Sequence, residues 1–464
     1  MKPTKFNNLA PEDADVMLEL SPILGITVAK RLTKGGDWKF YIENAQGEKR
    51  ILKIIKTEER YKYETGDRKD PVKWRNYHAR FKQLINTTNI IATQFVGDGT
   101  FREGTMSYEL TTWIDGEDLV DALPRLSPAQ QYAVGVKVGQ TLRELHKLPP
   151  PWEGLMPWDE SYTKNVQGKL QKYAEKPTKT RGEDLLTKYL SENMGLLKGR
   201  QRAFPHGDHN TENTILMPNG EIGLIDFAAL GADPWIDFWE FPHNVGENPH
   251  YNSGEINGYF DGKPPQEFFP LLAFYVANGY MGWYPQHADT ATGWFDDMKN
   301  PVPSWYYSFA QATRDDIPEI VDLYRSVIGM PGCTWSEDYP NKDTAEYDIN
   351  KGWLYALKKQ DKIAGVVSIG DFGELGDLKW KPKNPCELAR IGVHPEFQKQ
   401  GIGTLLLQHC FEIAKNQGFD GIRILVAKTN TTALALYEKN GFERCGEVNR
   451  FDIDFYCYQI ALEE

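Results

Sequence analysis

The stretch HGDHNTEN, residues 206–213, holds the residue types that a site for metal and phosphate needs. Asp208 and Asn213 lie in this stretch, and Asp226 follows in Ile-Asp-Phe, residues 225–227. Magnesium prefers oxygen ligands and phosphates and keeps some of its water, so a magnesium–nucleotide site needs few protein groups. One carboxylate, one amide and a separate base near an acceptor hydroxyl are enough. The alternative interpretation is a polar turn, because Gly-Asp is a common turn pair.

The segment between these residues indicates how they meet. Residues 214–226 place apolar, β-forming residues around Pro218-Asn219-Gly220, which is typical of a tight hairpin. A hairpin would bring Asn213 and Asp226 side by side. Asp208, on the preceding loop, could then face the same cleft.

A second stretch, residues 386–415, predicts an anion site of a different kind. A strand runs into a Gly-rich turn that opens a helix with Leu406, Cys410 and Ile413 on one stripe. Free amides at a helix N-terminus bind anions, so residues 398–403 would wrap a pyrophosphate. Two glycines of this spacing fit many nucleotide sites. The strand at 421–427 and the segment NTTALALYEKNGF, residues 430–442, make the pattern more specific.

The elements that must position these residues can be traced along the chain. Alternating β-formers predict strands within residues 23–55, at 90–97 and at 106–114, and residues 72–86 predict a helix. From Ser127 the pattern becomes helical, with Tyr132, Val136, Gly139 and Leu142 on one stripe. We interpret the strand-rich and helical parts as two lobes of one unit. A boundary is predicted near residue 305, and β and α signals alternate beyond it.

Composition narrows the class of protein. A chain of 464 residues predicts two or three domains. The net charge of −12 combines a basic first hundred residues with a very acidic third hundred, which argues against a nucleic-acid-binding protein. The acids could attract a cationic ligand or form a solvated face. No long apolar run or signal peptide is seen, and five late cysteines lack metal-binding spacing. A cytoplasmic protein without membrane partners is expected.

The first site resembles the aminoglycoside phosphotransferase family, relatives of the protein kinases. The resemblance rests on HGD-x4-N and Ile-Asp-Phe, with GADPWIDF (231–238), WIDGEDL (113–119) and LRELHKLP (142–149) in support. It implies that Asp208 is the base or orients the acceptor hydroxyl, and that Asn213 and Asp226 bind Mg²⁺. It further implies that His206 braces the loop and that Asp237 is structural.

The same resemblance implies a nucleotide site for ATP or GTP in the strand-rich lobe. Lys53, in RILKII, fits the lysine that pairs with phosphates, and Ile51 on the same strand face could touch the base. Gly35 and Gly36 would let a loop approach the phosphates closely. Kinases pair this lysine with a glutamate of the next helix, and residues 72–86 contain none. Its partner is unassigned, with Glu58, Glu59 and Glu64 preceding the helix.

The second site resembles the GNAT acetyltransferase family over roughly residues 309–462. The resemblance implies that the acetyl-CoA pyrophosphate meets the amides from Gln398 to Thr404, including Gly401 and Gly403. Pantetheine would run along Val393, Asn430 would contact the cofactor, and Tyr437 would protonate the leaving thiolate. An attacking amine must lose a proton, so a general base is expected. Glu387 is the candidate because strand alternation places it on the same face as Val393.

The sequence therefore predicts an α+β, bilobal, protein-kinase-like domain followed by an α/β mixed-sheet GNAT domain. Residues 1–300 form the first, with a small lobe at 1–110 and a large lobe at 115–300, and residues 305–464 form the second. The leading hypothesis is an enzyme that phosphorylates and acetylates small molecules with hydroxyls or amines, such as aminoglycosides, giving antibiotic resistance. The alternatives are a metabolite kinase, or a kinase for another antibiotic class, fused to a metabolite or protein N-terminal acetyltransferase, and a non-catalytic nucleotide or CoA sensor.

Overall fold

The computed structural model describes residues 6, 8–33, 38–59, 71–179, 182–228, 231–239, 248–282, 295, 297 and 300–462. The chain divides into two compact units. The first comprises Met1–Pro124, Thr141–Gly168 and Leu197–Phe238. The second comprises Arg125–Gln140, Lys169–Leu196 and Trp239–Glu464. Each unit is described separately below.

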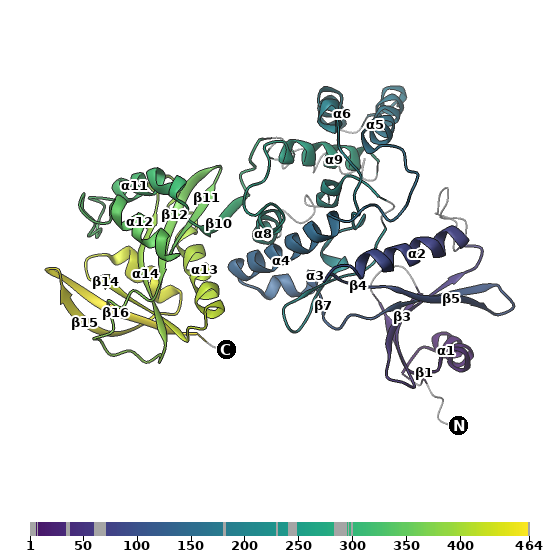
Figure 1. The fold of residues 1–464 in the computed structure, drawn as a ribbon, viewed down its shortest axis with the longest axis horizontal. Helices are drawn as coiled ribbons and strands as arrows, with labels where there is room; N and C mark the ends of the chain where they lie inside the picture. The colour runs from purple at the N-terminus through teal and green to yellow at the C-terminus, as the bar shows by residue number, and fades with distance from the viewer. Residues whose placement is uncertain are drawn as a thin grey trace. The chain divides into compact units, whose positions relative to one another are not determined.

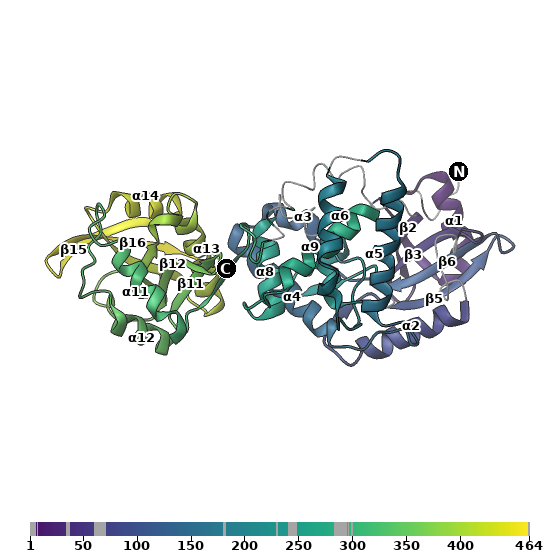
Figure 2. The ribbon, with the colours of Figure 1, turned by 90° about the horizontal axis from the view of Figure 1, so that it is seen from above.

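The first unit contains an antiparallel five-stranded sheet in the order β1-β2-β3-β6-β5. The strands are β1 (Ile26–Leu32), β2 (Trp38–Asn44), β3 (Lys49–Lys56), β5 (Phe95–Phe101) and β6 (Met106–Thr112). Alternate residues such as Phe40, Leu52 and Ile54 are buried in a core that includes the helix α1 (Pro11–Leu24). The helix α2 (Pro71–Ile85) lies on the opposite side of the sheet from α1 (Figures 1 and 2). The predicted helix at 72–86 is confirmed.

The predicted strand at 90–97 is wrong in one respect, because two short strands occupy this region. β4 (Ile91–Ala92) pairs with β9 in a second sheet, whereas β5 begins at Phe95. The amide of Thr93 still donates to the carbonyl of Leu224 at 3.0 Å, and the carbonyl of Gln94 already accepts from Thr112. The chain therefore changes sheets between Thr93 and Gln94, a step that a continuous apolar pattern does not reveal.

The second sheet of this unit has the order β4-β9-β8-β7, with β7 at Glu117–Asp118. β8 (Thr214–Leu216) and β9 (Ile222–Leu224) are antiparallel, and Thr214 is opposite Leu224. Gly220 has a φ of 76°, a conformation that favours glycine, and closes the turn between them. The predicted hairpin is therefore confirmed.

The second unit contains a helix pair that packs very closely through glycine. Helix α4 (Pro128–His146) contributes Gly135 and Gly139, and helix α8 (Pro249–Phe260) contributes Gly254 and Gly258. A Cβ atom on Gly139 would lie 1.9 Å from the carbonyl oxygen of Glu255. Only glycine permits this approach. Among the described residues up to 282, further helices are α3 (Leu119–Ala122) of the first unit, α5 (Trp158–Glu175), which spans both units, and α6 (Glu183–Glu192) and α9 (Phe268–Gly282) of the second.

The second unit also contains a seven-stranded mixed sheet, in the order β10-β11-β12-β13-β14-β16-β15. Its strands are β10 (Tyr307–Gln311), β11 (Leu354–Lys359), β12 (Lys362–Gly370), β13 (Pro385–Val393), β14 (Gly421–Ala427), β15 (Glu443–Arg450) and β16 (Ile453–Ala461). β13 and β14 are parallel, whereas the other neighbouring strands are antiparallel.

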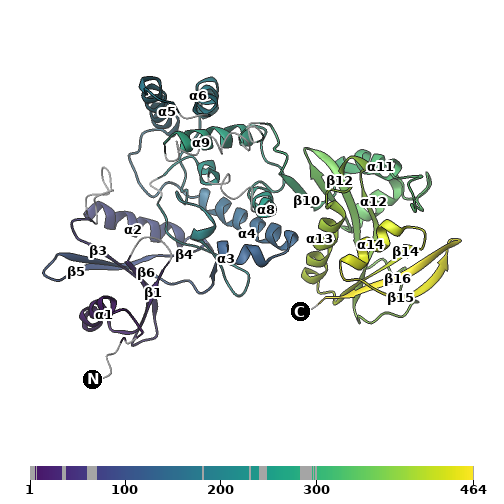
Figure 3. The ribbon, with the colours of Figure 1, turned by 180° about the vertical axis from the view of Figure 1, so that it is seen from behind.

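Helices cover both faces of this sheet (Figure 3). One core contains Leu354 and Ala356 of β11 together with α11 (Ile317–Ser326) and α12 (Lys342–Lys351). The other core contains Tyr355 and Leu357 together with α13 (Ile402–Asn416) and α14 (Thr431–Lys439). The alternation along β11 thus divides its side chains between two layers.

The second core continues into helix α4. Tyr132 belongs to it, and the ring of Tyr132 stacks on that of Tyr307 with centroids 5.1 Å apart. The amide of Phe309 donates to the Tyr132 hydroxyl at 3.0 Å. The mixed sheet therefore packs against residues that precede the predicted boundary near 305.

Two further observations concern membrane-spanning helices and the cysteines. Within the described ranges, no helix is both long and apolar enough to cross a bilayer. All five cysteines are free thiols.

Candidate active sites

A single loop brings Asp208 and Asn213 into direct contact. Nδ2 of Asn213 donates to Oδ2 of Asp208 at 3.0 Å and to its carbonyl oxygen at 2.8 Å. Asn210 holds this loop in shape, because its Oδ1 accepts from the amides of Glu212 and Asn213 at 2.8 and 2.9 Å. Asparagine and aspartate side chains commonly cap short turns in this way. The amide nitrogen of Asn213 is thus occupied, and its Oδ1 atom is available to a ligand.

The hairpin places Asp226 beside this loop. The amide of Ile225 donates to the carbonyl of Asn213 at 3.0 Å, so the two segments are hydrogen-bonded immediately before Asp226. Asp226 adopts a left-handed backbone conformation, with φ at 61°. Its carboxylate is 57% exposed and lies 3.3 Å from Nζ of Lys39, which sequence reasoning missed.

Asp237 fixes the start of this loop by hydrogen bonds to its backbone. This buried carboxylate accepts hydrogen bonds from the amides of His206 and Gly207 at 2.6 and 2.8 Å, and it lies 2.9 Å from Nε2 of His146. Burial would raise the pKa of Asp237, but the hydrogen bond and charge of His146 outweigh it and hold the pKa below its usual value. These contacts match the structural part expected of Asp237.

His206 packs inside the same loop. Its ring is fully buried and stacks on Phe227 with centroids 4.3 Å apart. Burial, with a smaller effect of His209, lowers the pKa of His206 to about 4, so the ring is neutral at physiological pH. A neutral, stacked ring is suited to supporting the loop.

The surroundings of Asp208 raise its pKa. The largest cause is burial, and the negative charges of Asp226 and Asp237 add to it, against the opposing hydrogen bond from Asn213. A carboxylate with a raised pKa accepts a proton more readily than a solvated one. This environment favours Asp208 as a proton acceptor.

The donor set fits magnesium bound together with phosphate. Asn213 offers an amide oxygen, and Asp226 offers a carboxylate that already attracts the cation of Lys39. No group of three or more His, Cys, Asp or Glu side chains suited to a metal occurs in the part of the chain that the structure describes. Two protein ligands suit Mg²⁺ only when nucleotide phosphates and water complete its shell.

The proposed nucleotide face of the first sheet holds Ile51 and Lys53 on one side of β3. Buried Leu52 and Ile54 point to the core, so Ile51 and Lys53 lie on the other face. Lys53 is opposite Glu109 of β6, an acid that sequence reasoning did not consider. Helix α2 contains no glutamate, as its sequence indicates. Gly35, Gly36 and Glu64 lie outside the described residues.

In the mixed sheet, β13 and β14 pair over three residues only, from Pro385–Gly421 to Glu387–Arg423. Beyond Glu387, the edge of β13 toward β14 has no strand partner among the residues described. Free amides and carbonyls on such an edge can bind an extended ligand. This edge includes Val393, the predicted pantetheine position.

Glu387 lies at the point where the two strands separate. It is buried, and its carboxylate accepts from Nη2 of Arg423 at 2.6 Å and from the amides of Leu375 and Glu374 at 3.0 and 3.2 Å. These contacts occupy lone pairs on both carboxylate oxygens. They favour a structural role for Glu387, and its assignment as the general base stays a prediction.

The prediction that Glu387 and Val393 share a strand face is wrong. Glu387 is opposite Gly370 and Val393 is opposite Gly365, an odd number of positions apart on β12. A register shift lies between them, where Arg390 has a φ of 50°. This bulge adds one residue and reverses the alternation. Arg390 is fixed there by buried Asp348, 2.7 Å from its Nε.

The loop before α13 has the geometry of an anion cradle. Lys399 and Gly401 have φ values of 60° and 82°, and α13 begins at Ile402, so Gly403 and Thr404 lie in its first turn. Nε2 of Gln398 donates to the carbonyl of Val393 at 3.1 Å and joins the loop to β13. The N–H groups of this first turn have no partner within the helix, as an anion site requires.

Asn430 is the N-cap of α14, and Tyr437 lies within this helix. Oδ1 of Asn430 accepts from the amide of Ala433 at 3.1 Å and caps the helix, while Gly332 of the α11–α12 loop approaches its Cα. Tyr437 is 1% exposed, and burial raises the pKa of its hydroxyl. A protonated tyrosine of this kind can donate a proton.

Two known families match separate parts of the chain. The pattern of the Phosphotransferase enzyme family matches residues 40–268, and that of the Acetyltransferase (GNAT) family matches residues 320–442. The chain joins a phosphotransferase-family domain to a GNAT-family domain. Asp208, Asn213 and Asp226 lie within the first match, and Gln398, Asn430 and Tyr437 lie within the second.

Curated relatives resemble part of the chain. An uncharacterized N-acetyltransferase of Methanocaldococcus jannaschii is 26% identical over 148 residues, 30% of this chain and 61% of that protein. A [ribosomal protein bS18]-alanine N-acetyltransferase of Salmonella typhimurium is 38% identical over 55 residues, 12% of this chain and 37% of that protein. The chain thus spans less than two thirds of either protein.

Two further proteins are matched by this chain over most of their own length. An L-methionine sulfoximine/L-methionine sulfone acetyltransferase of Pseudomonas aeruginosa is 26% identical over 148 residues, 30% of this chain and 83% of that protein. The crystal structure of the ribosomal-protein-S18-alanine N-acetyltransferase from Escherichia coli is 19% identical, with a TM-score of 0.28, covering 34% of this chain and 95% of that one.

Acidic residues of the phosphotransferase-family domain are less exposed than composition indicates. Of seven acids between residues 233 and 267, three are buried, namely Asp233, Asp237 and Glu255. Two are exposed (Asp261 and Glu267), and two lie outside the described residues (Glu240 and Glu247). The buried acids serve neither a solvated face nor an open surface for cations.

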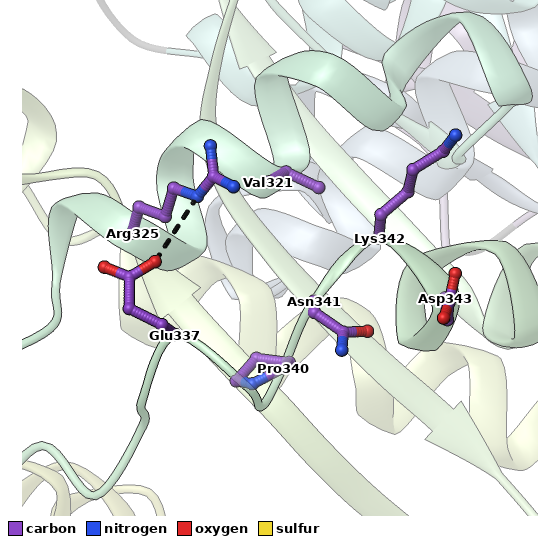
Figure 4. A pocket seen from close by; sticks show the side chains of 7 residues that line it. All are labelled: Val321, Arg325, Glu337, Pro340, Asn341, Lys342 and Asp343. Atoms are coloured by element: carbon purple, nitrogen blue, oxygen red, sulfur yellow. Dashed lines mark ion pairs between the residues drawn. The ribbon is translucent and has the colours of Figure 1, made fainter.

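Two small hollows contain none of the predicted site residues. One of about 280 Å³ is lined by Glu12, Asp13, Arg31 and Trp38. The other, of about 180 Å³, lies beside α11 and α12 in the GNAT-family domain, where Nε of Arg325 is 3.8 Å from Oε2 of Glu337 (Figure 4). Its lining is completed by Val321, Pro340, Asn341, Lys342 and Asp343.

Proposed function

We propose that the chain is a bifunctional, cytoplasmic small-molecule-modifying enzyme, with a phosphotransferase domain up to about residue 300 and an acetyltransferase domain from about 305. The observation that carries the first activity is the group formed by Asp208, Asn213 and Asp226. Asp208 accepts the proton of an acceptor hydroxyl, while Asn213 and Asp226 would hold Mg²⁺. The bound ion would neutralise charge on the phosphates of ATP or GTP. Lys53 pairs with these phosphates, and Ile51 contacts the base.

The second activity is transfer of an acetyl group from acetyl-CoA to an amine. The unpaired edge of β13 at Val393 binds pantetheine, and the turn from Gln398 to Thr404 binds pyrophosphate. Asn430 contacts the cofactor. The protonated hydroxyl of Tyr437 donates to the sulfur as the bond to the acetyl carbon breaks. Burial raises the pKa of Tyr437, so the hydroxyl carries its proton before the thiolate forms.

The class of acceptor molecule is inferred from the presence of a phosphotransferase and an acetyltransferase domain in one chain. A molecule with both hydroxyls and amines, such as an aminoglycoside, would serve both domains, and its modification would give antibiotic resistance. The burial of three acids weakens the electrostatic argument for a polycation. Relatives named for methionine sulfoximine and for a ribosomal-protein alanine support a second candidate, an amino-acid or peptide amine.

A screen by mass spectrometry tests these proposals. The full chain is incubated with Mg·ATP or Mg·GTP, with acetyl-CoA, and with panels of aminoglycosides, amino alcohols, amino acids and peptides. Asp208→Asn should abolish the phosphorylated product and leave the acetylated product unchanged. Loss of both products in this variant would contradict independent sites. Binding of nucleotide or CoA without any product would favour a sensor.

A further inference from the structure

Strand β2 carries a second lysine on the face where Lys53 lies. In the antiparallel register of β2 and β3, Lys39 is directly opposite Lys53, while Phe40 is opposite Leu52 and packs in the core. Residues directly opposite each other lie on the same face, and like charges so placed destabilise a sheet. Two cations in this position are therefore favoured when anions lie nearby.

The anions near the two lysines are different. Lys53 faces Glu109 across the sheet, in the register of β3 and β6. Lys39 instead reaches a segment 187 residues away, where its Nζ lies 3.3 Å from Oδ2 of Asp226. The Lys39 side chain is 22% exposed, which is less than half the exposure of the Asp226 carboxylate. The contact thus joins the sheet to the proposed magnesium ligand.

We propose that Lys39 is a second phosphate-binding residue of the nucleotide site, acting beside Lys53. This inference rests on the proposed phosphotransferase function. Asp226 would hold a divalent ion, which would neutralise this carboxylate as Lys39 does in the structure. Because Lys39 is held at Asp226, its ammonium would be within reach of phosphates bound with that ion. The ammonium then pairs with phosphate, so it helps to bind the nucleotide as well as to balance Asp226.

The competing explanation is a surface ion pair without function. Exposed pairs contribute little to stability or binding, so a neutral residue at position 39 would then leave nucleotide affinity unchanged. A charge-assisted hydrogen bond to phosphate predicts a measurable loss instead.

Isothermal titration calorimetry separates the two explanations. The full chain is titrated with Mg·ATP or Mg·GTP, whichever the wild type binds more tightly. Lys39→Met should weaken binding by about 10- to 100-fold. The corresponding nucleoside should bind equally well to both proteins, because it carries no phosphate. Lys39→Arg should retain most of the affinity.

Lys56→Met is the matched control. Lys56 is exposed at the end of β3, and strand alternation places it on the opposite face from Lys53. This variant should bind nucleotide as the wild type does. Lys39→Gln provides a second neutral variant if Lys39→Met does not fold, as judged by circular dichroism.

Unchanged affinity in a folded, neutral Lys39 variant, together with a loss in Lys53→Met, would overturn the inference and leave a single-lysine site. Equal losses for the nucleoside and the nucleotide would also overturn it, because the effect would not depend on phosphate. A wild-type chain that binds neither ligand would refute the proposed phosphotransferase function itself.

Discussion

The substitution Asp237→Asn tests how the catalytic loop is held. The buried carboxylate of Asp237 makes three hydrogen bonds, with the amides of His206 and Gly207 and with His146. An asparagine has one oxygen acceptor, so its NH₂ group must face at least one of these donors. The hydrogen bonds that remain are weaker, because their acceptor is a neutral amide oxygen instead of a charged carboxylate. A hydrogen bond to a charged group contributes about 1.5–3 kcal/mol, and a buried donor left unpaired costs about 1–3 kcal/mol. We therefore expect the free energy of unfolding to fall by about 3–5 kcal/mol.

Glu19→Gln is the control for this experiment. Glu19 also makes three hydrogen bonds, all to Arg102, but both side chains are about 40% exposed, at 43% and 38%. Its substitution should cost less than about 1 kcal/mol. Stability is measured by urea denaturation followed by tryptophan fluorescence. Hydrogen exchange at the amides of His206 and Gly207 should accelerate in Asp237→Asn alone. Equal stability losses in the two variants, with unchanged exchange, would refute the reasoning.

Three further predictions concern the second unit. Tyr437→Phe should slow acetyl transfer at least about tenfold with CoA affinity unchanged, and an unchanged rate would remove this hydroxyl from the mechanism. Burial, with a smaller effect of His250, lowers the pKa of His409 to about 3, whereas an unfolded histidine titrates near about 6.5. The unfolded state therefore binds the extra proton between these values, and stability falls as pH falls through this window. His409→Phe, which preserves the stacking on Phe309, should reduce that pH dependence in denaturant titrations. Gly139→Ala should destabilise the α4–α8 pair by about 1–3 kcal/mol, while Gly168→Ala, in open space on α5, should be neutral or stabilising. Similar melting temperatures for the two alanine variants would contradict the close packing.

Local patterns predicted most elements, because they depend on residues that are near in sequence. The strands around Phe40 and Leu52 alternate with period two, and the helix at Tyr132 shows a stripe of period 3.6. The hairpin could be predicted from Asn219-Gly220 and the apolar residues on either side of it. Asp208 was predicted to face the same cleft as Asn213, and the two residues are in contact on one short loop.

The errors concern features that depend on distant partners. The bulge at Arg390 reverses the faces of Glu387 and Val393, and periodicity contains no signal for one extra residue. The division between β4 and β5 depends on the pairing of Ile91 with Gly223, far along the chain. The contact between Lys39 and Asp226 spans 187 residues. Lys39 lies at odd spacing from the core residues Phe40 and Ile42 of β2, which places it on the face of Lys53 and could have suggested the contact.

The proposed phosphotransferase site requires a divalent ion that Asn213 and Asp226 bind only together with nucleotide. Electron paramagnetic resonance of Mn²⁺, used in place of Mg²⁺, measures the free ion directly. We predict that the free signal of dilute Mn²⁺ falls when ATP or GTP is bound to the wild-type chain, beyond the fall caused by nucleotide alone. Asp226→Asn should abolish this extra decrease. An equal decrease in Asp226→Asn, or ion binding by the wild type without nucleotide, would contradict the proposed site.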